Sequence, residues 1–142
     1  MNEAPVVRTA LREDFAPCAE LFASGQQEIE PRTPPWHPDE FAELVAGELL
    51  WVAAMGPAVA GFLSLARADA FVHFLHVAAR WRRRGIGRLL LAAARAETRR
   101  PLELKCLAGN RRALAFYRRL GWREVNRSQY PPAPYVRLRQ SP

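Results

Sequence analysis

Arg82-Arg83-Arg84-Gly85-Ile86-Gly87 is a basic turn with two glycines, and it joins the apolar run Phe71–Val77 to a helix-like run that begins at Arg88. Glycine lets a backbone approach a ligand closely and adopts positive φ angles at little cost. The free N–H groups at the start of the following helix point at an anion, and the helix dipole assists them. Arginine side chains add positive charge. This segment therefore predicts a phosphate-binding turn between a strand and a helix.

The bulk composition indicates one globular domain, residues 1–142, since 142 residues with 49% apolar content suffice for a core. No apolar run approaches the roughly 18 residues that span a membrane, and the N-terminal residues lack the pattern of a signal peptide. Cys18 and Cys106 lie far apart in the sequence. We expect reduced, buried thiols and a cytoplasmic location.

The net charge of +7 comes almost wholly from arginine, because Lys105 is the only lysine. A basic chain favours anionic partners, among them nucleic acid, anionic lipid and polyphosphate cofactors. Arginines concentrate over residues 80–88, which favours one local anion site over a uniformly basic surface.

The hydrophobic pattern predicts an α+β (mixed α/β) layer in which helices pack on a sheet. Strands are expected over residues 6–10, 49–55, 58–66, 71–77, 102–107, 122–127 and 135–139, and helices after Asp14 and over residues 39–48, 85–98 and 110–120. A polar, proline-containing loop is expected over residues 25–38. The run at 71–77 hardly alternates, which is typical of a central strand covered on both faces.

Two segments together resemble the GCN5-related N-acetyltransferases (GNAT family). Arg82, Gly85 and Gly87 fit that family's acetyl-coenzyme A motif, which is Arg or Gln, two residues, Gly, one residue, then Gly or Ala. Residues 110–122 resemble its later motif, where an asparagine opens a helix, an aromatic–tyrosine pair lies near the helix end and Gly-Trp leads into a strand. The resemblance implies a mostly antiparallel sheet of six to seven strands with about four helices, splayed between the strands at 71–78 and 102–108.

The same resemblance implies that acetyl-CoA is the cosubstrate and that acetyl passes directly to an amine. The pyrophosphate would lie in the glycine turn, and the pantetheine arm would pair with the strand edge at 75–77 like an added strand. The N–H of Val77 would bond the thioester carbonyl and stabilise the oxyanion. The implied cofactor-binding residues are Leu75, His76, Val77, Arg82, Arg83, Arg84, Gly85, Ile86, Gly87, Arg88, Asn110 and Tyr117.

Two side chains are the candidates for proton transfer. Tyr117 matches the family's usual general acid, which would protonate the leaving thiolate. His73 is the best candidate for the base, with a water chain as the alternative. It lies four residues before Val77, so we expect both to point to the same face of an extended strand, and arylalkylamine-type members carry a histidine at the matching position. Phe71 stands where histone-acetylating members carry a catalytic glutamate, so a histone-type mechanism is not expected.

The amine acceptor is the least defined part of the sequence. Glu28, Glu30, Trp36 and His37 fall in the expected first loop, which borders the acceptor pocket in the family, and acidic groups there would suit a cationic amine. Tyr130 and Tyr135 flank a proline-rich connection that would approach the same place. Antibiotics, polyamines, amino acids, arylalkylamines and protein N-termini all stay open as acceptors, no metal is expected, and the resemblance allows a homodimer.

Other readings of these residues stay open. The arginine cluster also suits a nucleic-acid-binding module, although no zinc-ligand set or recognition-helix pattern supports one, which makes nucleic acid the less favoured partner. A family member that binds acyl-CoA without turnover, acting as a sensor, is a third possibility. His76 is expected to point away from His73 and to serve the structure, and Cys106 is expected to pack in the core.

Overall fold

The computed structural model describes residues 4–129 and 133–142, and within them the chain forms a seven-stranded sheet of order β1-β2-β3-β4-β5-β7-β6. Only the pairing of β4 with β5 is parallel; every other neighbouring pair is antiparallel. The strands are β1 Val6–Thr9, β2 Leu49–Met55, β3 Ala58–Ala66, β4 Phe71–Val77, β5 Glu103–Leu107, β6 Arg123–Ser128 and β7 Tyr135–Arg139. The helices are α1 Phe15–Ile29, α2 Glu40–Leu44, α3 Ile86–Ala96 and α4 Arg111–Arg119, with short 3-10 turns at Arg12–Asp14, Arg67–Asp69 and Ala79–Trp81.

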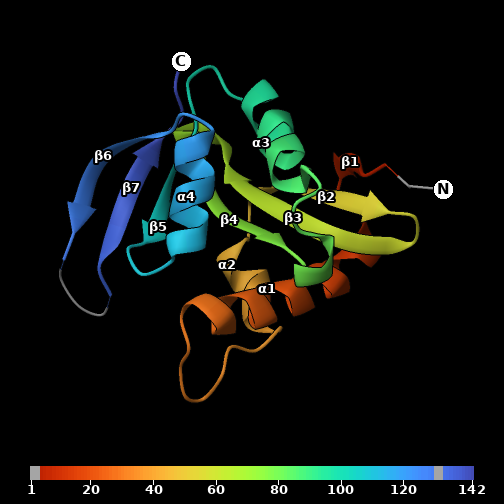
Figure 1. Ribbon diagram of the computed structural model, residues 1–142. Coiled ribbons are helices and arrows are strands. Elements are labelled where there is room, and N and C mark those ends of the chain that lie inside the picture. Colours follow the sequence, from red (N-terminus) through yellow and green to blue (C-terminus); the bar gives the residue numbers. More distant parts are fainter. Residues whose placement is uncertain (1–3, 130–132) are drawn as a thin grey trace.

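The helices cover the sheet from both sides, with α3 and α4 on one face and α1 and α2 on the other (Figure 1). Strand β3 shows how alternation divides the core, because Leu63 packs with the α3 residue Leu90 while Phe62 packs with Phe22 and Phe41 of α1 and α2. The strand at 71–77 is central and covered on both faces, as its pattern predicts. The expected α+β fold with a mostly antiparallel sheet is confirmed.

Helix α1 is longer than the sequence pattern indicates. It continues through residues 25–29, where we expected a loop to begin, and it ends only at Ile29. Gly25 lies inside the helix, and a Cβ atom there would sit 2.4 Å from Nδ1 of His76. This glycine permits close packing of helix on strand and does not end the helix. Asp14 precedes the helix, but its side chain makes no hydrogen bond to the first turn: its carboxylate accepts a hydrogen bond from the backbone N–H of Leu11 and pairs with Arg8.

Two irregularities in β4 create the site. Its pairing with β5 is restricted to Phe71↔Glu103 and Val72↔Leu104, after which the two strands diverge as expected. Its pairing with β3 shifts register, because Leu65 pairs with Val72 while Ser64 pairs with Phe74. His73 is thus the extra residue of a β-bulge, a feature that re-aims side chains.

Candidate active site

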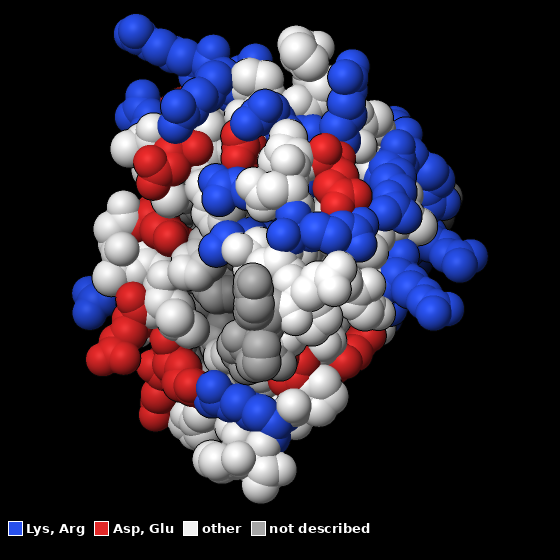
Figure 2. Space-filling model, turned by 90° about the vertical axis from the view of Figure 1, so that its left-hand side faces the viewer, with Lys and Arg blue, Asp and Glu red and all other residues white. Residues whose placement is uncertain are grey.

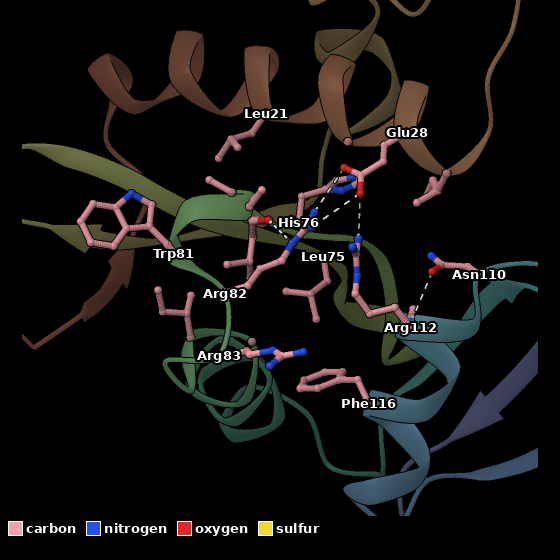
Figure 3. Close-up of a pocket in the computed structure, with 18 of the residues that line it drawn as sticks. Leu21, Glu28, Leu75, His76, Trp81, Arg82, Arg83, Asn110, Arg112 and Phe116 are labelled. Carbon is pink, nitrogen blue, oxygen red and sulfur yellow. Dashed lines mark hydrogen bonds and ion pairs between the residues drawn. The ribbon is translucent and has the colours of Figure 1, made fainter.

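A cleft of about 780 Å³ opens where β4 and β5 diverge. Four elements surround it: α1, the end of β4, the turn leading into α3, and α4 (Figure 3). Of the residues predicted to bind the cofactor, the lining includes Leu75, His76, Val77, Arg82, Arg83, Gly85, Ile86, Gly87, Asn110 and Tyr117. Arg84 and Arg88 do not line it, and both side chains are exposed, with the Arg84 guanidinium 5.0 Å from the ring centroid of Trp81.

The turn has the backbone expected of an anion cradle. Arg83 and Gly85 both adopt left-handed conformations, with φ of 63° and 77°, and α3 begins immediately afterwards at Ile86. Alternating backbone conformations of this kind gather successive N–H groups into a concavity that binds anions, and the first N–H groups of α3 have no partner within the helix. Gly87 has a different reason for being glycine, since a Cβ there would meet the ring of Phe116 at 3.0 Å. It allows α3 and α4 to approach each other beside the cleft.

The open edge of β4 presents backbone groups to the cleft. The N–H of Ala78 donates to the carbonyl of Ala60 on the β3 side, so alternation turns the N–H groups of Leu75 and Val77 the other way, toward the gap left by β5. The carbonyl of Val77 accepts a hydrogen bond of 3.3 Å from Nε of Arg82. The edge therefore offers two donors to an extended ligand in the gap.

Helix α4 and its N-cap place Asn110 and Tyr117 on the other wall of the cleft. Asn110 caps the helix as predicted, since its side-chain oxygen accepts from the N–H of Ala113 at 3.3 Å. Tyr117 is only 6% exposed and packs against Phe116 and Trp122. Burial raises the pKa of Tyr117 above its usual value, so this phenol is a neutral hydrogen-bond donor at physiological pH.

Glu28 lines the first cleft and not the second, and it does not lie in the predicted loop. It stands in the last turn of α1, and its carboxylate accepts hydrogen bonds from Arg82 at 3.3 Å and Arg112 at 3.1 Å (Figure 3). The hydrogen bond from Arg82, followed by that from Arg112, lowers the pKa of Glu28. The Glu28 carboxylate therefore bridges Arg82 and Arg112 across the cleft. The ligand expected in this cleft is also anionic and would compete with Glu28 for these arginines.

A second, smaller cleft of about 270 Å³ meets the first at Leu75, Asn110 and Tyr117, which line both. Its lining also includes Gln26 and Glu30 at the end of α1, Lys105 and Cys106 of β5, and Tyr135 of β7. His73 lies here and not in the first cleft. The expectation that His73 shares a face with Val77 is wrong, because the bulge places its ring against Phe74, with centroids 4.0 Å apart.

Two of the proposed acceptor residues lie outside both clefts. The indole N–H of Trp36 donates to the carbonyl of Glu30 at 2.9 Å, and its ring packs edge-on against Phe22. His37 is exposed and lies 3.4 Å from Asp39. Trp36 therefore anchors the connection after α1, whereas Glu30 is the member of that predicted set that reaches the second cleft. The predicted role of Tyr130 falls outside the described residues.

The expectation that His76 points away from His73 is wrong, because the bulge turns His73 to the same face and both rings lie against Phe74. Nε2 of His76 pairs with Oε1 of Gln26 at 2.9 Å, and burial, with Arg82 nearby, lowers the pKa of His76 to about 4. Cys106 packs in the core as expected. Burial raises the pKa of the Cys106 thiol to about 11, so it is neutral and packs as an apolar group.

Glu48 is the residue of this region that the sequence did not reveal. Its Oε2 lies 2.9 Å from Nδ1 of His73. The available signal was weak: one acidic residue between Gly47 and the apolar run that forms β2.

Arginines extend well beyond the phosphate turn. Figure 2 shows them on the upper and right-hand parts of the face that carries β6 and β7, with acidic side chains among them. The basic surplus is therefore spread more widely than the sequence cluster at 80–88 indicated.

Among residues 4–129 and 133–142, no group of three or more His, Cys, Asp or Glu could hold a metal ion. No helix in the described part of the chain is long and apolar enough to cross a bilayer.

Comparison with known proteins agrees with this geometry. A GCN5-related N-acetyltransferase from Rhodopseudomonas palustris has 20% identity and a TM-score of 0.78, with 100% of this chain and 98% of that chain covered. A ribosomal-protein-alanine N-acetyltransferase from Brucella melitensis has 19% identity and a TM-score of 0.74, covering 95% and 98% of the two chains. NAA60 of Arabidopsis thaliana, in complex with a bisubstrate analogue, has 18% identity and a TM-score of 0.70, covering 96% and 98%.

At these identities the structures establish the fold alone. No curated protein matches the sequence. The model of the acetyltransferase (GNAT) family matches residues 9–122, which is most of the chain and includes both motifs. The chain therefore belongs to the GNAT family of N-acetyltransferases, enzymes for which acyl transfer from acetyl-CoA is general.

Proposed function

We propose that this enzyme transfers acetyl from acetyl-CoA directly to a primary amine of a small molecule or peptide. One observation carries the proposal: a basic cleft with an anion cradle and a second cleft that holds the carboxylate of Glu30 meet at Tyr117 and the open edge of β4. This arrangement brings an anionic acyl donor and a cationic acceptor together from opposite sides.

The residues of the first cleft suit the cofactor. The N–H groups of the turn from Arg83 to Gly87 would hold the pyrophosphate, and Arg82 and Arg112 would add positive charge near it. The edge of β4 at Leu75 and Val77 would pair with the amides of the pantetheine arm. Arg84 and Arg88 would contribute through the backbone, because their side chains lie outside the lining.

The residues where the clefts meet would carry the chemistry. The N–H of Val77 or Leu75 would bond the thioester carbonyl and stabilise the oxyanion as the amine attacks. A carbon–nitrogen bond forms as the carbon–sulfur bond breaks. Of the two protons that the ammonium group loses, one would go to His73, directly or through water. Tyr117 would give its own proton to the sulfur and recover the second ammonium proton through water, which restores the phenol. Neutral Tyr117 is suited to stabilise the departing thiolate by a hydrogen bond.

The acceptor side supports an amine without selecting one. Glu30 places a carboxylate at the margin of the second cleft, and apolar side chains such as Phe74 and Leu104 line its interior. By its name, the similar Brucella melitensis protein acts on an alanine of a ribosomal protein, and a peptide N-terminus is accordingly included among our candidate acceptors. We further propose a cytoplasmic enzyme, since both cysteines are free thiols, and a homodimer, which light scattering would test.

The direct test is release of coenzyme A thiol with acetyl-CoA and a panel of amines. The panel should contain 2-phenylethylamine, spermidine, free amino acids and tetrapeptides that begin with alanine or serine. Turnover of at least one amine is expected, and Tyr117→Phe should lower kcat more than it changes the affinity for acetyl-CoA. Equal losses in both would assign Tyr117 to binding or packing.

Calorimetry distinguishes the other two functions. Binding of acetyl-CoA that survives moderate salt, without turnover of any amine, would favour an acyl-CoA sensor. Salt-sensitive binding of a short DNA duplex without cofactor binding would favour a nucleic-acid module.

A further inference from the structure

We propose that Glu48 is a positioning residue for His73: it holds the imidazole with its N–H on Nδ1 and leaves Nε2 as the proton acceptor toward the second cleft. This inference rests on the proposed function for its catalytic meaning. Its structural content, which is the tautomer of His73, can be tested without any substrate.

The geometry is that of a carboxylate behind an imidazole. Oε2 of Glu48 lies 2.9 Å from Nδ1 of His73. The Glu48 side chain is 14% exposed and that of His73 is 32% exposed. His73 lines the second cleft and Glu48 does not. The imidazole therefore lies between the half-buried Glu48 carboxylate and the second cleft.

The carboxylate has few alternatives to this role. Its other oxygen, Oε1, is buried and has no hydrogen-bond partner among the described residues. Leaving one oxygen of a carboxylate unpaired in the interior costs free energy, so Glu48 is a poor choice for stability alone. The contact with His73 is the interaction that the structure supplies for it.

Packing fixes the ring as well as the hydrogen bond does. The ring of His73 stacks on Phe74 at an interplanar angle of 19°. The bulge that turns His73 toward Phe74 also brings it to Glu48, which immediately precedes β2, two strands away in the sheet. A histidine in regular register would point to the opposite face of β4, with Leu75 and Val77.

The charges around the ring support one tautomer. Neutral imidazole carries a single N–H, and a carboxylate oxygen at hydrogen-bond distance requires that proton on Nδ1. Around the second cleft, Glu30 and Lys105 are the other charged groups facing His73; Cys106, Tyr117 and His76 are neutral near pH 7, with Tyr135 on the far wall. When Nε2 accepts a proton, the imidazolium forms directly beside the Glu48 anion, which stabilises it.

The decisive measurement is long-range ¹H–¹⁵N NMR of the imidazole in the protein without substrate at a pH where His73 is neutral. The wild type should show the Nδ1–H tautomer at His73. In Glu48→Gln that preference should weaken or reverse, since an amide can donate to Nδ1 as well as accept from it. Glu43→Gln, which changes an exposed residue of α2, is the matched control and should leave the spectrum unchanged. An Nε2–H tautomer in the wild type, or an unchanged tautomer in Glu48→Gln, overturns the proposal.

A kinetic cycle tests the consequence, with 2-phenylethylamine and an alanine-initiated tetrapeptide as probe acceptors. His73→Ala should lower kcat by about 10²-fold, the lower end for a general base, and Glu48→Gln by about 10-fold, with the KM for acetyl-CoA unchanged. The double variant should be no slower than His73→Ala alone, because Glu48 acts through His73. An additive loss would refute the coupling. If neither probe is acetylated, the proposed function fails for these acceptors, while the tautomer still decides the role of Glu48.

Discussion

Acid should destabilise this fold through one enclosed side chain, His76. Burial, with a contribution from Arg82, lowers the pKa of His76 from 6.5 to about 4. In the unfolded chain the imidazole regains its ordinary value near 6.5. Between these two values the unfolded state binds a proton and the folded state does not, so stability is complete above pH 6.5 and falls as the pH decreases toward 4.

The magnitude follows from the shift. One pH unit is worth about 1.4 kcal/mol, so lowering the pKa from 6.5 to about 4 removes about 3 kcal/mol of the free energy of unfolding by pH 4 and about 2 kcal/mol between pH 6.5 and 4.5. These are upper values, because the His76 side chain retains a small exposed area. The surroundings of His76 explain why protonating its neutral ring is costly. Nε2 is hydrogen-bonded to Gln26, Nδ1 faces Gly25, and Phe62 and Phe74 flank the ring, so the added charge would have no partner.

Urea unfolding of wild type and His76→Gln at pH 6.5 and 4.5 isolates this effect. Glutamine can still bond Gln26 but does not titrate, so the variant should be less stable at pH 6.5 because of lost packing yet nearly insensitive to this pH change. The carboxylates with lowered pKa values, such as Glu28 and Glu103, are common to both proteins and lose their contribution at lower pH. An equal loss of stability in the two proteins would refute the assignment to His76.

Three further substitutions test other contacts. Gly25→Ala should lose about 2 kcal/mol in urea unfolding, because overpacking and the disturbed His76 hydrogen bond outweigh about 1 kcal/mol of helix propensity; Gly109→Ala, whose Cβ meets nothing within 4 Å, should be near neutral. Arg83→Gly should raise the free energy of unfolding by about 0.5–1 kcal/mol by relieving its left-handed φ, yet weaken acetyl-CoA binding in calorimetry, and unchanged stability would argue against strain there. Glu28→Gln should tighten acetyl-CoA binding by about two- to fivefold, since its carboxylate competes with phosphate for two arginines; weaker binding would mean that Glu28 assists the cofactor.

The sequence predicted a turn or helix end correctly where the residues of that segment alone determine its conformation. The turn at 82–87 and the cap at Asn110 are of this kind, because glycine conformation and a side-chain cap depend on immediate neighbours. The end of α1 was predicted wrongly because a glycine such as Gly25 can either end a helix or lie inside one. A glycine that ends a helix and a glycine that accommodates another element look identical in sequence, and only the position of His76 on β4 distinguishes them.

The acceptor side could not be predicted because a bulge decides it. A period of two placed His73 with Val77, in the cofactor gap, whereas one extra residue between the pairs Leu65↔Val72 and Ser64↔Phe74 transfers His73 to the other face. That transfer separates the candidate base from the glycine turn at 82–87 and its arginines and gives it Glu48 as a neighbour. In regular register the imidazole would instead compete for space with the ligand that the β4 edge is open to receive. In the proposed reaction the bulge would divide β4 between the two substrates, with the backbone of Leu75 and Val77 toward the acyl donor and the side chain of His73 toward the amine.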